Sequence, residues 1–106
     1  MPAVSITVDA SLDATKVAQA AHAAVKDGIG KPDMYITVGV AVGVVLIGGK
    51  PGKVLAHVDS IGGNFAAFMD KFCASLADMG VSANEVTCTF RSVTMKEFGM
   101  NGAPLG

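Results

Sequence analysis

The chain has 106 residues, a length that fits one domain and excludes a multidomain enzyme. Its formal net charge is −1 and only 16% of its residues are charged, so it has no basic field that could attract nucleic acid or an anionic membrane surface. Hydrophobic residues make up 51% of the chain, and 13 more residues are glycine. A domain this small cannot bury so much apolar surface alone, so we expect a ligand pocket or, more strongly, an oligomer.

The N-terminal segment lacks the basic region of a signal peptide. The most apolar run, residues 36–47, is shorter than the ~20 residues that span a bilayer. We therefore expect a cytoplasmic protein without a membrane segment. Cys73 and Cys88 are too few for a disulfide scaffold and have no CxxC spacing, which favours two small buried hydrophobic residues.

The first half of the chain predicts a strand, a helix and a second strand. Residues 4–8 are rich in β-branched side chains. A helix is expected over residues 12–27, with Ser11 as N-cap and Gly28 ending it. Its inward face is predicted to consist of Val17, Ala21, Ala24 and Val25.

The apolar segment 34–47 has the composition of a long strand, with Gly43 as a bulge or turn. Residues 48–52 form a glycine-containing turn cluster. This cluster is not a phosphate-binding loop, because Val44 stands where that motif needs glycine and Pro51 where it needs serine or threonine.

The second half predicts a strand over 54–61, a helix that opens at 62–64 and ends at Gly80, and a strand over 86–90. The helix carries an apolar stripe at spacings of three and four, which is typical of a core face. The stripe consists of Phe65, Phe68, Phe72, Leu76 and Met79.

Shifting the sequence by 52 residues aligns helix with helix and the strand at 4–8 with the strand that follows residue 53. We therefore predict an α+β fold in one domain, 1–106, with two βαβ pseudo-repeats over about 2–48 and 53–95 and a tail over 96–106. The sheet has four strands with both helices on one face. We expect its uncovered face to account for the apolar excess and to be buried in a closed trimer or dimer.

Few residues can carry chemistry. The sequence offers no Ser-His-Asp or Cys-His arrangement and no paired carboxylates. His22 is predicted to be a solvated helix residue, and His57 an exposed or hydrogen-bonded strand residue. We expect no metal and no cofactor.

Pro2 is the remaining candidate. Methionine before a small residue is normally removed, which would leave the Pro2 nitrogen as a secondary amine. An α-amino group has a pKa of about 7.7–8.0, and burial or a nearby cation lowers it further. Such a group can act as a base that removes a proton beside a carbonyl.

Several short motifs, in order along the whole chain, accompany Pro2. They are Gly30-Lys31-Pro32 followed by Tyr35-Ile36, Gly48-Gly49, Ser60-Ile61-Gly62 and Phe98-Gly99-Met100-Asn101-Gly102. With these motifs and Pro2, the chain resembles the macrophage migration inhibitory factor (MIF) family of the tautomerase superfamily.

This resemblance implies a homotrimer with active sites between subunits. It implies cofactor-independent keto–enol tautomerisation of phenylpyruvate- or dopachrome-like α-keto compounds. By motif match Pro2 would be the base, Lys31 would hold the substrate carboxylate, and Ser60 and Ile61 would contact substrate. Tyr35 and Phe98 complete the implied site.

The chain also departs from the family. Thr87, Thr89 and Met100 stand where tyrosine, asparagine and tryptophan are frequent, so substrate choice is open. Lys53 and Ala56 replace the CxxC pair of the family, and we predict no thiol–disulfide activity. The second helix also begins several residues sooner than usual.

Two alternatives to the tautomerase remain. One is a non-catalytic, cytokine-like trimer that binds a protein receptor, which the departures at positions 87 and 89 favour. The other is an unrelated ferredoxin-like ligand-binding module, which would be a monomer. Secretion without a signal peptide, as in some relatives, is the alternative to a cytoplasmic location.

Overall fold

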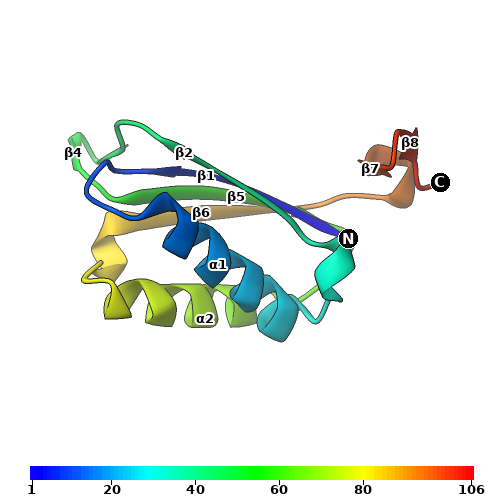
Figure 1. The fold of residues 1–106 in the computed structure, drawn as a ribbon, viewed down its shortest axis with the longest axis horizontal. Coiled ribbons are helices and arrows are strands. Elements are labelled where there is room, and N and C mark those ends of the chain that lie inside the picture. The colour runs from blue at the N-terminus through cyan, green and yellow to red at the C-terminus, as the bar shows by residue number, and fades with distance from the viewer.

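Two βαβ units share one four-stranded mixed sheet in the computed structural model, which describes residues 1–106 (Figure 1). The strands are β1 (Pro2–Val8), β2 (Thr37–Val42), β5 (Val54–Ser60) and β6 (Val86–Ser92), in the order β2-β1-β5-β6. Each unit pairs its own two strands in parallel, and β1 and β5 pair antiparallel at the centre. The predicted fold class is confirmed.

Both helices cover the same face of the sheet (Figure 1). They are α1 (Ala14–Ala24), which continues as one π-helical turn over Val25–Ile29, and α2 (Phe65–Asp78). Alternate residues of β1 and β5 point toward them, because successive side chains of a strand face opposite sides. The resulting core includes Val4, Ile6, Val8, Val17, Ala21, Val54, Val58, Phe68, Phe72 and Leu76.

The internal repeat is visible in the central strands. β1 spans residues 2–8 and β5 spans residues 54–60, an offset of 52, and both have the same alternation of buried and exposed positions. The offset that aligned the sequence with itself is therefore the offset between equivalent strands.

Both predicted ends of the first helix are wrong. Asp13, not Ser11, is the N-cap, since its side chain accepts hydrogen bonds from the Thr15 and Lys16 backbone amides, while Ser11 donates to Asp9. The helical stretch also runs past Gly28 to Ile29 and stops at Gly30, whose φ of 81° is the left-handed conformation that favours glycine.

The apolar segment 34–47 is not one strand. It comprises the end of a 3-10 turn (Asp33–Tyr35), then β2, an irregular stretch over residues 43–45, and β3 (Leu46–Ile47), which pairs with β4 (Lys50–Pro51). In the second half, Asn64 caps α2 and Gly80 follows its end, as predicted.

The last strand extends to Ser92, two residues beyond the prediction. A short 3-10 turn at Ala83–Glu85 precedes this strand, and another at Met95–Glu97 follows it. A small hairpin of β7 (Gly99–Met100) and β8 (Ala103–Pro104) then stands apart from the main body (Figure 1).

The uncovered face of the sheet is not the source of the apolar excess, so that prediction is wrong. The valines and isoleucines of the strands point toward the helices, which leaves mainly small and polar side chains on the other face. That face carries Ala3, Ser5, Thr7, Thr37, Gly39, Ala41, Leu55, His57, Asp59, Thr87, Thr89 and Arg91.

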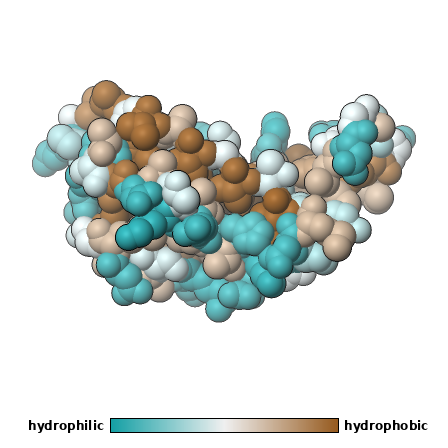
Figure 2. All heavy atoms as spheres, in the orientation of Figure 1, coloured by the Kyte–Doolittle hydropathy of each residue, from teal (hydrophilic) through white to brown (hydrophobic).

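Exposed apolar side chains gather instead around the end of the edge strand β2. Val42, Val44 and Leu46 are 58%, 88% and 61% exposed, and Figure 2 shows hydrophobic surface over this region. An edge that is both apolar and unpaired favours association with another chain.

No helix of the protein is both long and apolar enough to span a membrane.

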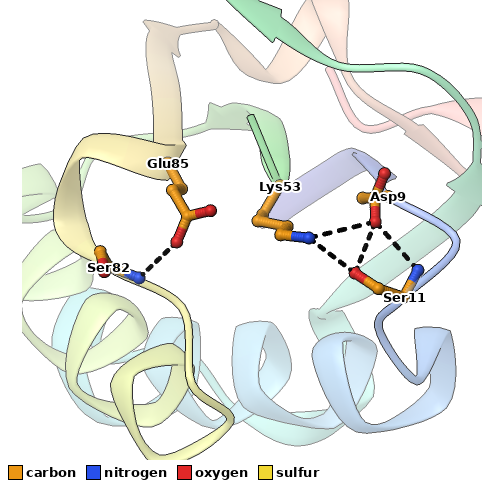
Figure 3. Close-up of polar contacts among 5 residues, drawn as sticks. All are labelled: Asp9, Ser11, Lys53, Ser82 and Glu85. Atoms are coloured by element: carbon orange, nitrogen blue, oxygen red, sulfur yellow. Dashed lines mark hydrogen bonds and ion pairs between the residues drawn. The ribbon is translucent and has the colours of Figure 1, made fainter. Parts of the chain in front are cut away.

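A polar cluster joins the two βαβ units at the end of the sheet far from Pro2 (Figure 3). The Lys53 ammonium contacts the Asp9 carboxylate at 3.4 Å and donates to the Ser11 hydroxyl at 2.9 Å. In the backbone, the Asp9 amide donates to the Lys53 carbonyl and the Lys53 amide to the Glu85 carbonyl, both at 2.9 Å. Lys53 thus links the ends of β1, β5 and β6.

We predict that Gly28→Ala destabilises the fold. A Cβ at this position would lie 2.8 Å from the Phe68 backbone nitrogen and 2.9 Å from the Ala67 carbonyl carbon, so backbone would have to move. We expect the free energy of unfolding to fall by about 2 kcal/mol and Tm by ~10 °C in a denaturation experiment. Gly39→Ala is the control, because its Cβ would meet nothing within 4 Å. Equal effects of the two variants would contradict close packing at Gly28.

We also predict an acid-sensitive contribution from Asp9. Hydrogen bonds from Ser11, with a smaller effect of Lys53, lower the pKa of Asp9 from 3.8 to about 2. A lowered folded-state pKa stabilises the fold above pH ~4 and loses that stabilisation as the pH falls toward 2. Tm measured across this range should therefore fall less steeply for Asp9→Asn than for the parent protein. Identical slopes would refute the contribution.

Candidate active site

Pro2 lies at the start of β1, and its side chain is almost fully buried. It pairs in register with Ser60, the last residue of β5. The amide of Ile61 donates to the Met1 carbonyl at 3.4 Å. The antiparallel pairing of β1 with β5 thus brings the beginning of the chain to the segment Ser60–Ile61.

Ser60 is fully buried and holds the turn that follows it. Its hydroxyl donates to the Gly62 carbonyl at 2.7 Å, and its carbonyl accepts from the Val93 amide at 3.0 Å. Gly63 has a φ of 118°, and a Cβ there would lie 2.2 Å from a methyl carbon of Ile29. These contacts fix the direction in which Ile61 leaves the sheet.

Lys31 follows the left-handed Gly30 directly, and in space it lies near Met1. Burial lowers the pKa of the Met1 amine, and the charge of Lys31 lowers it further. Lys31 itself takes part in no ion pair. The structure therefore brings Pro2, Lys31, Ser60 and Ile61 to one end of the sheet.

The remaining predicted residues of the same chain lie around this end. Tyr35 belongs to the 3-10 turn that follows Lys31 and is 37% exposed. Phe98 is buried, and Met100 is half-buried in β7. Phe98 lines an open cavity of about 230 Å³ that includes neither Pro2 nor Lys31. The other lining residues are Ala3, Asp59, Arg91, Val93, Glu97 and Gly99.

Thr87 and Thr89 are not near Pro2 of their own chain. Both are exposed on the uncovered face, where they pair in register with Leu55 and His57. It is Ser92, further along the strand, that stands beside Ser60. The Thr89 hydroxyl is hydrogen-bonded to the His57 ring, so the prediction of an exposed, hydrogen-bonded His57 is confirmed.

A charged pair that was not predicted from the sequence lies beside this end of the sheet. Arg91 donates to Asp59 from Nε at 3.1 Å and from Nη2 at 3.0 Å, and this contact raises the pKa of Arg91. Hydrogen bonds from Thr94 lower the pKa of the neighbouring Glu97. Asp59 and Arg91 have opposite charges and occupy paired positions of β5 and β6. The sequence alone could indicate this ion pair only if the register of the two parallel strands were known.

The two cysteines are free and half-buried. Burial, and to a lesser degree Cys73, raises the pKa of Cys88 to about 12, so this thiol stays protonated at neutral pH. A protonated thiol is a poor nucleophile and a poor metal ligand. No group of three or more histidine, cysteine, aspartate or glutamate side chains is arranged to hold a metal ion.

No protein-family model matches the chain, and no curated protein matches its sequence. Solved structures do match. A MIF-like protein from Entamoeba histolytica is 23% identical with a TM-score of 0.85, and the alignment covers 97% of each chain. MIF from Toxoplasma gondii is 25% identical with a TM-score of 0.70, over 96% of this chain and 98% of that one. A fused 4-OT described as a symmetric trimer is 20% identical with a TM-score of 0.77, over 97% and 95%.

The chain therefore has the tautomerase-superfamily fold, in the form found in MIF-like proteins and fused 4-OT. The resemblance predicted from the motifs is confirmed at the level of the fold. Further structures with this fold include Pt0534 inactivated by 2-oxo-3-pentynoate, at 24% identity with a TM-score of 0.72, over 97% of this chain and 95% of that one.

Proposed function

We propose that the protein, once Met1 is removed, is a cofactor-independent keto–enol tautomerase with Pro2 as its general base. The observation that carries this proposal is the position of Pro2, buried at the start of β1 beside Ser60 with Lys31 close to the chain start. Burial and a neighbouring cation both favour the neutral form of an amine, which is the form that accepts a proton.

The proposed reaction needs one proton to move between two atoms of an α-keto acid. In the enol-forming direction the Pro2 nitrogen takes a proton from the carbon beside the carbonyl. The electron pair of that C–H bond moves into the new C=C bond, the carbonyl π pair moves onto oxygen, and this oxygen then receives a proton. Lys31 pairs with the substrate carboxylate, which orients the reacting carbon. Before substrate binds, the charge of Lys31 lowers the pKa of the amine.

Ser60, Ile61, Tyr35 and Phe98 complete the site of the same chain in this proposal, and Met100 borders it. Thr87 and Thr89 would serve the site of a neighbouring copy, because both are exposed and lie away from their own Pro2. We accordingly propose a homotrimer acting on phenylpyruvate- or dopachrome-like compounds. Thr87 and Met100 would give such a site less aromatic wall than the family usually has, and Thr89 would lack the amide of the usual asparagine.

The first test is ultraviolet-monitored ketonisation of phenylpyruvate enol, with protein whose intact mass confirms the loss of Met1. We predict turnover, and a fall of at least about 100-fold in kcat/KM for Pro2→Gly, since a positioned general base contributes about 10²–10⁴. Pro51→Gly is the matched control, because Pro51 is exposed in β4 at the other end of the sheet.

Protein that retains Met1 should be as inactive as Pro2→Gly, because the Pro2 nitrogen is then an amide. Absence of turnover with a confirmed free Pro2 would refute the proposal. That result would make the non-catalytic trimer the better account.

A second prediction concerns 2-oxo-3-pentynoate, which inactivates Pt0534. A neutral secondary amine adds to the alkyne carbon furthest from the ketone, so an N–C bond forms and the amine proton moves to the adjacent carbon, with no leaving group. We expect one adduct per chain with the full mass of the reagent, located on the peptide that begins with Pro2. Reaction at Cys73 or Cys88 instead would argue against a neutral Pro2 amine.

A further inference from the structure

The segment that carries Lys31 and Tyr35 also carries a carboxylate, Asp33. Each Asp33 oxygen lies close to a side chain of the first helical stretch. Lys26 Nζ lies 3.0 Å from Oδ2, and His22 Nε2 lies 3.5 Å from Oδ1. Lys26 and His22 are four residues apart, the spacing at which helix side chains share a face.

Lys31 lies only two residues before Asp33 but does not pair with it. Pro32 between them is extended, with φ −64° and ψ 148°. A lysine ammonium on its flexible four-carbon stem can reach a carboxylate at this separation. Asp33 is the carboxylate nearest to Lys31 in the sequence, and it could pair with Lys31 if it had no other partners.

We propose that Lys26, assisted by His22, holds the Asp33 carboxylate away from Lys31 and so keeps the Lys31 ammonium available to an acidic substrate. This inference rests on the proposed function. In it Lys26 is a positioning residue: it touches neither the substrate nor Pro2, and it acts by removing a competitor for the cation that does.

The backbone around Lys26 supports this role. Lys26 lies in the π-helical turn Val25–Ile29, in which Val25 and Ile29 are buried and Gly28 packs against the backbone of α2. The Gly30 amide donates to the Val25 carbonyl at 3.1 Å, which closes the turn before Lys31. The Lys26 stem therefore starts from a fixed place, while Lys31 lies just beyond it.

The charges of this cluster also fit the role. Lys26 and Asp33 are 51% and 60% exposed, so solvent screens their contact and its effect on the fold is small. Competition between Lys26 and Lys31 for the Asp33 carboxylate has a larger consequence. It decides whether the Lys31 ammonium is available to bind the carboxylate of a substrate. Its effect should appear in substrate affinity rather than in stability.

The kinetic test uses Met1-free protein and phenylpyruvate enol. Lys26→Met should raise KM by up to about fivefold with kcat unchanged, because Asp33 is released to Lys31. Asp33→Asn in the Lys26→Met background should return KM to the parent value. Lys71→Met, which removes a lysine of α2 that makes no ion pair, controls for net charge.

Lys31 decides between competition and a direct effect of Lys26. In a Lys31→Met background, Lys26→Met should change KM no further. An unchanged KM in Lys26→Met alone, or the same KM increase with and without Lys31, would overturn the inference.

A second readout does not depend on catalysis. The pKa of the Pro2 amine, measured by NMR titration of ¹⁵N-labelled Met1-free protein, should rise in Lys26→Met and recover in Lys26→Met/Asp33→Asn, because Asp33 neutralises the field of Lys31 in the first variant only. An inactive parent protein would refute the proposed function alone. A Pro2 pKa that Lys26→Met leaves unchanged would overturn the inference even if the parent protein is active.

Discussion

The antiparallel pairing of β1 with β5 is the interaction on which the rest of the structure depends. Each βαβ unit forms its own parallel pair, and this central pairing joins the two pairs into one sheet. It buries alternate residues of both strands under the helices, and it sets Pro2 opposite Ser60. A shift of one residue would turn the apolar side chains of a strand toward solvent, so burial of the core also fixes the position of the chain start.

The same pairing gives the two ends of the sheet different characters. At the end where β1 finishes, Lys53 is held by Asp9 and Ser11, so its charge is used within the fold. At the end where β1 begins, Lys31 has no ionic partner and lies near a buried chain start. A cation that is not neutralised within the protein costs stability if it is desolvated, and it is the kind of group that a ligand carboxylate can satisfy. The unpaired Lys31 beside the buried chain start therefore supports the proposal that the site lies at the Pro2 end.

Much of this arrangement could be predicted from local patterns. Strand alternation, the apolar stripe of α2 and glycines after the helices predicted the element order, and the 52-residue repeat predicted the topology. The errors came where local signals competed. Ser11 is a good N-cap residue, but Asp9 binds its hydroxyl and Asp13 caps the helix instead. Gly28 looked like a helix end because glycine often has that role, whereas here it allows close contact between α2 and the π-helical turn.

The site was harder to predict than the fold, because its parts lie far apart in the sequence. Met1-Pro2 is too common to indicate chemistry by itself, and Lys31 becomes informative only when the fold puts it near the chain start. The ion pair of Asp59 with Arg91 depends on the register of β5 and β6. The contacts of Asp33 with Lys26 and His22 depend on the π-helical turn. Neither of these can be read from periodicity.

The uncovered face bears on how many copies a working site needs. Because its side chains are mainly small or polar, this face can remain hydrated without a large free-energy cost. The apolar side chains that do need cover, such as Val44 and Leu46, lie at the β2 edge instead. Association of copies through this edge would leave the polar faces open, with Thr87 and Thr89 exposed on them. In the proposed trimer, the apolar edge would then drive assembly, while the open face would set which side chains a neighbouring copy presents to Pro2.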